Sequence, residues 1–413
     1  MLDYKKIDAK VLLFCRNLDQ LEIQRLPFKK SVFSGIENSW LVEQHFAQKA
    51  AMLKISEWNG NEKIIFPDKL SVEQSSSGWI AKWKSRLVPE NTELLIDGTA
   101  GLGVDCFYLG QKVNHVVAFE IDKLRAAILE HNLNALNLRN FDVIKAGFEE
   151  VISLFPITNP ERTFVYLDPD RRPDLSQKAN SWEKSEPDLL LIFNILKEMG
   201  THFLVKLSPM DNPWELVSKM EGVSQIFVVS LHLEVKEVLV YWDFASPTKP
   251  PEFAIVEIQR SGIFAKIIVS DLHLENQNLG KPLTNQYLYD PWPALRKGFM
   301  AKHCLGSDLF MLLSPEAQLF ASVAILENVP ARIFRILEVV DSFSLFSKNW
   351  KGKRLNVISR NFFASAEEIK KRNGFLDGGE NYLFCYQSID KQNVYILTEK
   401  VANQYSEAFW QNF

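Results

Sequence analysis

The 413-residue chain is long enough for two or three domains, and its 46% hydrophobic and 24% charged content is that of an ordinary globular protein. A net charge of −4 argues against attraction of the whole protein to nucleic acid, while a local basic patch stays compatible with it. The four cysteines are widely spaced, and no apolar run is long enough to cross a membrane. We therefore predict a cytoplasmic protein without a disulfide framework, a metal site, membrane association or an obligate protein partner.

Residues 1–90 predict a helical N-terminal cap that packs on the following domain. In the stretch SWLVEQHFAQKAAMLK, apolar side chains recur on one helical face. They are Val42, Phe46, Ala50 and Leu53. A second helical stretch, SSSGWIAKWKSRLV, begins with serines that suit an N-cap. Gln74 lies directly before it, so we expect this side chain to reach a ligand from the cap.

Strands and helices alternate from residue 91 to 246, which predicts a Rossmann-like α/β domain with parallel strands joined by right-handed crossovers. The last two apolar runs, SQIFVVSLH and EVLVYWDF, are separated by only about four residues, too few for a crossover helix. The last strand must therefore turn back antiparallel beside the sixth. The fold class that we predict is α/β, with a seven-stranded sheet whose last strand is antiparallel.

The stretch DFASPTKPPEF contains three prolines within five residues, which predicts a linker. Beyond it, the pattern of residues 252–413 becomes α+β and predicts a separate domain or two small ones. Ser365 and Glu368 form the spacing of a capping box at the start of a short basic helix.

The motif LLIDGTAGLGVD, residues 94–105, is a buried strand followed by a glycine-rich turn, which usually cradles a nucleotide. A dinucleotide frame G-x-G-x-x-G fails here, because the frame that starts at Gly101 ends at Cys106. The carboxylate of Asp97 would repel a pyrophosphate but attract a cationic ligand. S-adenosylmethionine carries an ammonium and a sulfonium group, and we predict it as the cofactor. The turn residues expected to hold it are Gly98, Thr99, Gly101 and Gly103.

Acidic residues follow three of the predicted strands, namely Asp97, Glu120 and Asp168. Ligands of open α/β sheets bind at the carboxyl ends of the strands, so these side chains should converge. Glu120 is placed to accept both ribose hydroxyls. For the adenine ring two assignments stay open: Phe148 stacks on its face, or Glu149 accepts its amino group.

The second motif, VYLDPDRRPD, places Asp168 and Pro169 at a strand end, where proline forces the chain out of the sheet towards the transferable methyl group. Asp170, Arg171 and Arg172 follow and are expected to contact substrate, since paired arginines suit a phosphate or a nucleobase edge. In the alternative interpretation the two arginines only bridge neighbouring aspartates on the surface.

The motifs DGTAGLGVD, LDPDRRP and VKLSPMD, with LYDPWPALRKGFM, RLNVISRNF and EEIKKRNGF in the tail, resemble class I bacterial methyltransferases that carry a THUMP-like C-terminal domain. The resemblance covers most of the chain, from about residue 5 to 400. It implies that the C-terminal region binds RNA and that RNA, either tRNA or rRNA, is the substrate. Asp170 stands where that family usually has a small residue.

Methylation at pyrimidine C5 generally needs a cysteine soon after the fourth or fifth strand, and none of the cysteines lies there. Direct in-line transfer is therefore predicted, in which Asp168 orients or deprotonates the acceptor. Lys206 either assists it or serves only as its structural partner. For RNA capture, the basic stretch KNWKGKRLNVISR offers Lys351, Lys353 and Arg354, although such a run can equally be a solvated face.

Two rival functions stay open at this stage. The first is a methyltransferase that acts on a protein or a small molecule, which the near-neutral net charge favours. The second is a non-catalytic RNA-binding protein with a vestigial cofactor pocket. It is favoured because Ala146 and Gly147 follow the third predicted strand, where many methyltransferases have an acid or amide that binds the adenine amino group.

Overall fold

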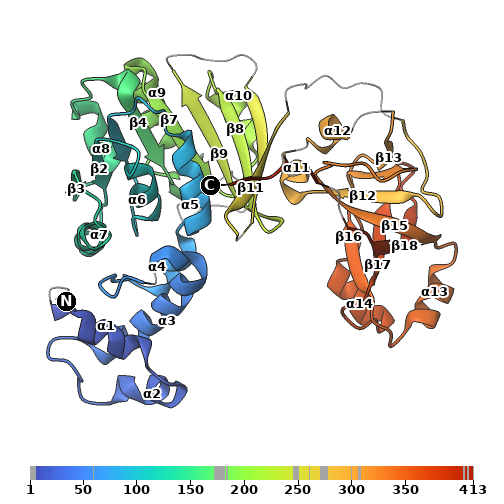
Figure 1. The fold of residues 1–413 in the computed structure, drawn as a ribbon, viewed down its shortest axis with the longest axis horizontal. Helices are drawn as coiled ribbons and strands as arrows, with labels where there is room; N and C mark the ends of the chain where they lie inside the picture. Colours follow the sequence, from blue (N-terminus) through green and yellow to red (C-terminus); the bar gives the residue numbers. More distant parts are fainter. Residues whose placement is uncertain are drawn as a thin grey trace.

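The computed structural model describes residues 6–58, 60–171, 182, 185–244, 251–259, 261–269, 278–298, 300–305, 308–402, 405–406 and 409–412. They form a mixed α/β structure with a helical N-terminal part, a ten-stranded sheet flanked by helices and a seven-stranded sheet. Figure 1 shows these parts as an arch, with the ten-stranded sheet between the N-terminal helices and the smaller sheet. None of the described helices is long and apolar enough to cross a bilayer.

The N-terminal part consists of short helices around one longer helix, α3. They are α1 (Ala9–Arg16), α2 (Gln20–Arg25), α3 (Asn38–Lys54), α4 (Lys69–Gln74) and α5 (Gly78–Lys84), with 3-10 turns η2 (Leu26–Phe28), η3 (Ser56–Trp58) and η4 (Ser85–Leu87). Ser77 caps α5 by accepting a hydrogen bond from the Ile80 N–H, as the serine-rich start predicts.

The prediction that Val42, Phe46, Ala50 and Leu53 form the buried face of α3 is wrong. Leu53 is 83% exposed, whereas polar side chains on the other face are buried. His45 Nδ1 lies 2.7 Å from the Cys15 carbonyl oxygen, and Gln48 donates to the Leu12 carbonyl at 3.2 Å. This face is buried because its side chains satisfy backbone groups at the end of α1, which apolar side chains cannot do.

The large sheet has the order β19-β11-β10-β8-β9-β7-β4-β1-β2-β3. Its strands are β1 (Leu94–Asp97), β2 (His115–Phe119), β3 (Phe141–Ile144), β4 (Thr163–Leu167), β7 (His202–Leu207), β8 (Gln225–Leu231), β9 (Glu234–Asp243), β10 (Glu252–Ile258), β11 (Ile263–Val269) and β19 (Gln411–Asn412). As predicted, β9 is antiparallel to β8, and it lies between β7 and β8.

Helices cover both faces of this sheet (Figure 1). They are α6 (Val104–Gly110), α7 (Lys123–Ala135), α8 (Phe148–Val151), α9 (Leu189–Met199) and α10 (Pro213–Lys219), with 3-10 turns η5 (Ile152–Leu154) and η6 (Pro160–Arg162). Central strands such as β4 are buried along their whole length, because apolar side chains on each face meet a separate core. The two cores fix the strand ends to which the polar residues of the site are attached.

The strands β10 and β11 correct two predictions. The sequence places residues 252–269 in the C-terminal region, but β10 pairs in parallel with β8 and extends the first sheet. The sheet therefore has ten strands rather than seven. Phe253 and Ala254 point to opposite faces of β10 and are both fully buried, which is typical of a central strand. The predicted proline linker, residues 245–250, lies outside the described residues.

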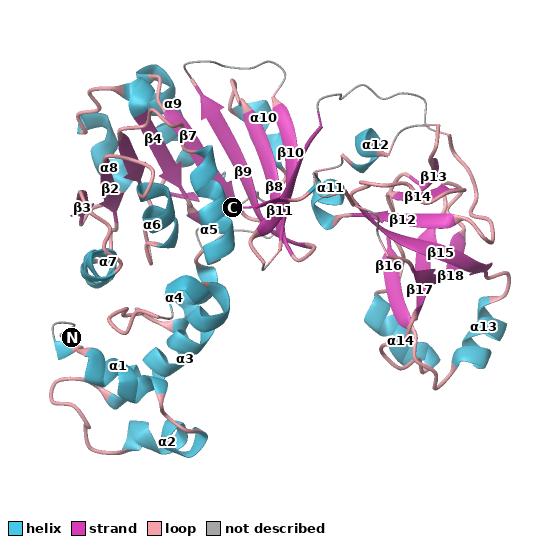
Figure 2. Cartoon of the chain, viewed as in Figure 1, coloured by secondary structure: helices cyan, strands magenta, loops and turns pink. Residues whose placement is uncertain are grey.

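The second sheet has the order β13-β14-β12-β15-β18-β17-β16 (Figure 2). Its strands are β12 (Tyr287–Pro291), β13 (Met311–Ser314), β14 (Leu319–Ser322), β15 (Ala331–Val339), β16 (Asn356–Arg360), β17 (Asn381–Gln387) and β18 (Asn393–Lys400). The accompanying helices are α11 (Pro293–Lys297), α12 (Ala301–Cys304), α13 (Phe343–Trp350) and α14 (Ala366–Asn373). The predicted capping box of α14 is confirmed: the Glu368 N–H donates to Ser365 Oγ, and the Ser365 N–H donates to the Glu368 carboxylate.

Candidate active site

A cavity of about 1280 Å³ opens at the carboxyl ends of β1, β2, β4 and β7. The structure brings all of the predicted cofactor and catalytic residues into its wall, together with one predicted substrate residue, Asp170. They are Gln74, Asp97, Gly98, Thr99, Gly101, Gly103, Glu120, Phe148, Asp168, Pro169, Asp170 and Lys206. These side chains meet as predicted, because parallel strands deliver their ends to one edge of the sheet, while their roles stay predictions.

The glycine-rich turn passes close to the core, and its glycines have separate roles. Gly103 has φ +89° and precedes α6, a backbone conformation that side chains disfavour. A Cβ at Gly98 would lie 2.4 Å from Leu167 Cδ2 and 2.6 Å from the Phe148 ring. Gly98 therefore lets the turn sit directly on the core beside the cavity.

We expect Gly98→Ala to lower the free energy of unfolding by about 1–3 kcal/mol, because the added methyl group overpacks this contact. Gly60→Ala is the matched control, since a Cβ there meets no atom within 4 Å. Urea denaturation of both variants checks the expectation. Equal midpoints for Gly98→Ala and Gly60→Ala would contradict the tight packing of the turn.

Asp97 is the most deeply placed carboxylate among the predicted cofactor residues. It is 1% exposed, and the Thr99 N–H donates to its Oδ1 at 3.1 Å. Among the described residues, no other hydrogen bond reaches this carboxylate. Burial raises its pKa from 3.8 to about 8, and the nearby carboxylates of Asp105 and Asp168 act in the same direction.

Glu120 follows β2 at the opposite wall of the cavity and is half-buried. Its Oε1 accepts a hydrogen bond from the Asp122 N–H at 2.8 Å, which fixes the carboxylate in place. Burial raises the pKa of Glu120, while this backbone hydrogen bond opposes the rise. A backbone hydrogen bond from Gly101 and the charge of Arg125 also oppose the rise.

The two candidates for the adenine side differ in what they can offer. Phe148 is 1% exposed, and its ring packs edge-to-face on Phe119 with centroids 5.0 Å apart. It forms part of the wall but has no free face for stacking. Glu149 also lines the cavity, and its Oε2 accepts a hydrogen bond from the Asp188 N–H at 2.7 Å.

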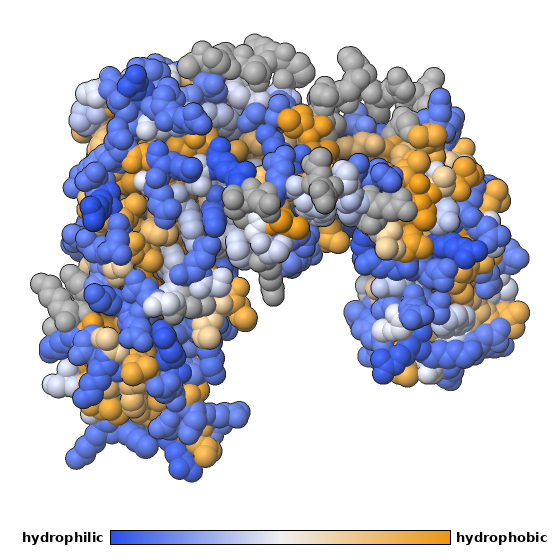
Figure 3. All heavy atoms as spheres, in the orientation of Figure 1, coloured by the Kyte–Doolittle hydropathy of each residue, from blue (hydrophilic) through white to orange (hydrophobic). Residues whose placement is uncertain are grey.

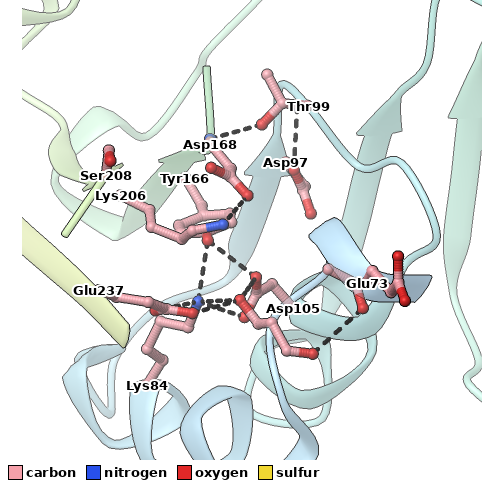
Figure 4. Close-up of polar contacts among 12 residues, drawn as sticks. Glu73, Lys84, Asp97, Thr99, Asp105, Tyr166, Asp168, Lys206, Ser208 and Glu237 are labelled. Carbon is pink, nitrogen blue, oxygen red and sulfur yellow. Dashed lines mark hydrogen bonds and ion pairs between the residues drawn. The ribbon is translucent and has the colours of Figure 1, made fainter. Parts of the chain in front are cut away.

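Asp168 and Lys206 form an ion pair at the ends of β4 and β7 (Figure 4). The Asp168 N–H donates to Thr99 Oγ1 at 2.7 Å, which connects this strand end to the glycine-rich turn. Burial raises the pKa of Asp168 although Lys206 opposes the rise. Burial would lower the pKa of Lys206, but Asp168 and further carboxylates outweigh it and raise that pKa. The ionised form of Asp168 is therefore stabilised mainly by the Lys206 ammonium group, with a further contribution from Lys84.

Sequence reasoning missed a buried polar network beside this pair. Lys84 is fully buried and contacts Asp105 Oδ1 at 2.7 Å and Glu237 Oε2 at 3.0 Å (Figure 4). Ser76 Oγ lies 2.7 Å from an oxygen of each carboxylate and can donate to either one, and Tyr166 Oη donates to Asp105 at 2.9 Å. The sequence does contain a feature that could have indicated this network, namely polar residues within apolar patterns. Lys84 follows Trp83 in GWIAKWK, and Tyr166 lies within the buried strand TFVYL.

Lys84→Met is expected to lower the free energy of unfolding by about 3–5 kcal/mol, because it leaves two buried carboxylates without their cation. The matched control is Lys82→Met on the same helix. Lys82 is 42% exposed and lies 3.6 Å from Glu57, and such surface pairs contribute about 0–1 kcal/mol. Chemical denaturation measures both variants, and a Lys84→Met protein as stable as Lys82→Met would refute the assigned role of the network.

The charges at this end of the sheet do not balance. Among the described residues that line the cavity, nine carry a carboxylate and only three, Arg125, Lys206 and Lys236, carry a positive charge. The carboxylates are therefore incompletely compensated when they are ionised. Because an unpaired buried charge is costly, the cavity favours a ligand that brings positive charge.

The predicted substrate-side residues are only partly placed. Asp170 is exposed at the cavity mouth, and the backbone of Asp170 and Arg171 forms β5 (Asp170–Arg171), which pairs with β6 (Ser185–Glu186). Arg172 lies outside the described residues. The contact of Arg171 and Arg172 with substrate therefore stays a prediction.

The basic residues Lys351, Lys353 and Arg354 do not line the cavity. They follow α13 in the C-terminal unit and are exposed, and Lys353 Nζ lies 5.6 Å from the centre of the Trp350 ring. Arg360, at the end of the same basic stretch, instead contacts the buried Asp290. The stretch is therefore not one continuous solvated face.

Within the described part of the chain, no group of three or more His, Cys, Asp and Glu side chains is arranged to hold a metal ion. The four cysteines are free thiols, and none of them is among the residues that line the cavity. Cys106 is buried in α6, and burial raises its pKa well above the ordinary value. A cysteine nucleophile is thus not available in the described wall of this site.

A search of family models finds no match for the sequence, and a search of curated proteins finds none either. Among solved structures, the chain is similar to a "putative methyltransferase" from Porphyromonas gingivalis W83, with 23% identity and a TM-score of 0.77. The match covers 97% of this chain and 100% of the other. The two proteins therefore share a fold along almost their entire lengths.

Shorter solved structures match only part of the chain. An rRNA methylase from Streptococcus thermophilus has 16% identity and a TM-score of 0.30, and the match covers 39% of this chain and 93% of the other. A protein from Streptococcus mutans in complex with SAH gives the same identity and TM-score, with 39% and 94% covered.

Proposed function

We propose that this protein is a class I methyltransferase that uses S-adenosylmethionine as the methyl donor. The observation that carries the proposal is Asp97, a buried carboxylate beside a glycine-rich turn, in a cavity whose carboxylates outnumber its ammonium groups. A dinucleotide or a nucleoside triphosphate would add negative charge to this excess. The P. gingivalis protein that shares the fold is described as a methyltransferase, in agreement with this proposal.

The residues present fit this donor. Asp97 would pair with its cationic amino acid part, and Glu120 would accept the ribose hydroxyls as a carboxylate does in bidentate contacts. Gly98, Thr99, Gly101 and Gly103 form the turn against which the donor packs, and Gln74 closes the cavity from α4. When bound, the donor supplies an electrophilic methyl group on a sulfonium.

In this proposal Asp168 acts on the acceptor. The carboxylate takes the proton of the acceptor atom, or orients that atom, while the methyl group passes directly to it. Lys206 stabilises the carboxylate before the proton arrives, and Pro169 turns the chain out of the sheet so that the backbone beside Asp168 faces the cavity. Such positioning can contribute on the order of 7–11 kcal/mol to lowering the barrier.

RNA is the proposed acceptor. The basis is the resemblance of the tail motifs to THUMP-like domains, together with the exposed basic residues Lys351, Lys353 and Arg354. In this assignment residues 1–90 cap the cofactor cavity, the large sheet carries the chemistry, and the second sheet binds RNA. Asp170, Arg171 and Arg172 would meet the acceptor nucleotide.

One observation favours a different acceptor. The wall of the cavity also carries Glu149, Glu150, Asp170, Glu186 and the buried Asp211, and these carboxylates repel phosphate groups. A protein side chain or a small cationic molecule would enter such a cavity more readily. A methyltransferase that acts on one of these is therefore the second candidate.

Donor carrying a tritiated methyl group separates the two candidates when the protein is incubated with total RNA and with total protein. We expect label in RNA that ribonuclease releases and protease does not. Label confined to the protein fraction would overturn the RNA assignment and leave the methyltransferase proposal intact.

A further inference from the structure

A single buried carboxylate in the C-terminal unit is surrounded by three arginines. Asp290 ends β12 and is fully buried, while Arg296 comes from α11, Arg332 from β15 and Arg360 from β16. Arg332 Nε donates to Asp290 Oδ2 at 3.1 Å, and Arg360 donates to both carboxylate oxygens at 3.1 Å. Arg296 Nη1 also pairs with Oδ1. One carboxylate thus orients three guanidinium groups from separate elements.

This cluster carries excess positive charge. Within the described residues, Asp290 is the only carboxylate that lies within 4 Å of any of the three guanidinium groups. Their side chains are only 19%, 28% and 22% exposed, so water compensates them incompletely. Burial, together with the charges of Arg360 and Arg332, lowers the pKa of Arg296 to about 10, although Asp290 opposes the fall. Two positive charges remain without a partner, which is costly for partly buried groups.

An ion pair that only held β12 to α11, β15 and β16 would not need three arginines. One bidentate guanidinium is sufficient to satisfy a carboxylate, and each further one adds repulsion. A bound anion would compensate the two positive charges that Asp290 does not. Arginine also presents a planar fork that matches the oxygens of a phosphate.

The surroundings of Arg360 provide space for such an anion. A hollow of about 560 Å³ lies beside it, lined by Ser359, Asn361, Ser365 and the start of α14. Figure 1 places β16 and α14 on the side of the C-terminal unit that faces the N-terminal helices. In Figure 3 the molecule is hollowed between these two parts, and hydrophilic residues cover the C-terminal side of the hollow.

We propose that Arg296, Arg332 and Arg360, held by Asp290, form a binding site for a backbone phosphate of the RNA acceptor. This inference rests on the proposed RNA methyltransferase function and names a contact that the exposed run of Lys351, Lys353 and Arg354 does not provide. Those side chains are solvated and must be ordered on binding, whereas the arginine cluster is fixed in advance.

The test compares the double variant Arg332→Gln/Arg360→Gln with Arg335→Gln. Arg335 lies on the same strand as Arg332, is 48% exposed and lies 3.6 Å from Glu399. Fluorescence anisotropy with labelled, mixed-sequence single-stranded RNA gives the affinity at several salt concentrations. We expect the double variant to bind about tenfold more weakly or worse, with a salt slope reduced by about 1–2, because phosphate contacts release counterions. Arg335→Gln should bind like the wild type.

A folded double variant with the RNA affinity and salt slope of the wild type would overturn the site. If the double variant does not fold, the melting temperature of the wild-type protein provides the test. Inorganic phosphate should raise this temperature more than chloride does at equal ionic strength. The variant Arg360→Lys should show a smaller difference between the two anions. No difference between phosphate and chloride would also overturn the site. Calorimetry with S-adenosylmethionine is run in parallel, so that failure of donor binding contradicts the methyltransferase proposal and not the phosphate site.

Discussion

Replacing Asp168 with asparagine is expected to lower the rate of methyl transfer by about 10²–10⁴-fold, the usual contribution of a general base, while donor affinity changes little. The amide keeps the shape of the side chain but cannot take a proton. The backbone contact to Thr99 is preserved, because the N–H of residue 168 and not its carboxylate makes it. Incorporation of label under single-turnover conditions measures the rate, and calorimetry measures donor affinity.

Asp142→Asn is the matched control for this experiment. The Asp142 side chain is 71% exposed and is not among the residues that line the cavity, whereas Asp168 lines it and is paired with Lys206. We expect the control to retain transfer within about tenfold of the wild type, because an exposed carboxylate is screened by water. Equal loss of donor binding and transfer in Asp168→Asn would show that the proposed division of roles is wrong.

Asp97→Asn is expected to weaken S-adenosylmethionine binding by about 10²-fold or more, since it removes a buried charge-assisted contact of about 3 kcal/mol or more. The same change should stabilise the unliganded protein. Folding raises the pKa of Asp97 from 3.8 to about 8, so the ionised carboxylate destabilises the empty site as the pH rises between these values. An uncharged amide removes that penalty, and thermal melting near pH 8 should show a higher midpoint for the variant.

The same pKa predicts the pH dependence of donor binding. Below about pH 8 the free protein carries a proton on Asp97, which must leave before the carboxylate can pair with a cation. Affinity should therefore rise by up to about tenfold per pH unit towards pH 8 and then level off. The control Asp142→Asn, with a side chain 71% exposed beside His115, should retain this profile. A pH-independent affinity in the wild type would contradict the assignment of Asp97.

The sequence predicted the cavity well because its residues follow from local rules. A carboxylate directly after a buried strand can only be at a strand end, so Asp97, Glu120 and Asp168 had to meet if the strands were parallel. Glycine spacing argued against a dinucleotide in the same local way, and this exclusion stays a prediction. These inferences needed no knowledge of long-range contacts.

Features that depend on long-range partners could not be predicted in this way. The buried Lys84 contacts Glu237, far along the chain, and only folding shows that the two side chains meet. Polar residues of α3 are buried because they reach backbone groups of α1. Strand β10 joins the large sheet because β8 leaves an edge free, a fact of topology that the apolar run alone does not contain. Arg360 appeared to be part of a solvated basic run, yet Asp290 holds it from another strand.

The most direct test of the central claim is calorimetric titration of the wild-type protein with S-adenosylmethionine near pH 8, with NAD as the comparison ligand. We predict saturable binding of S-adenosylmethionine at one site and no heat from NAD, because S-adenosylmethionine has a net positive charge, whereas the pyrophosphate of NAD brings negative charge to the carboxylates around Asp97. No saturable heat from S-adenosylmethionine at millimolar concentration, or tighter binding of NAD, would contradict the account.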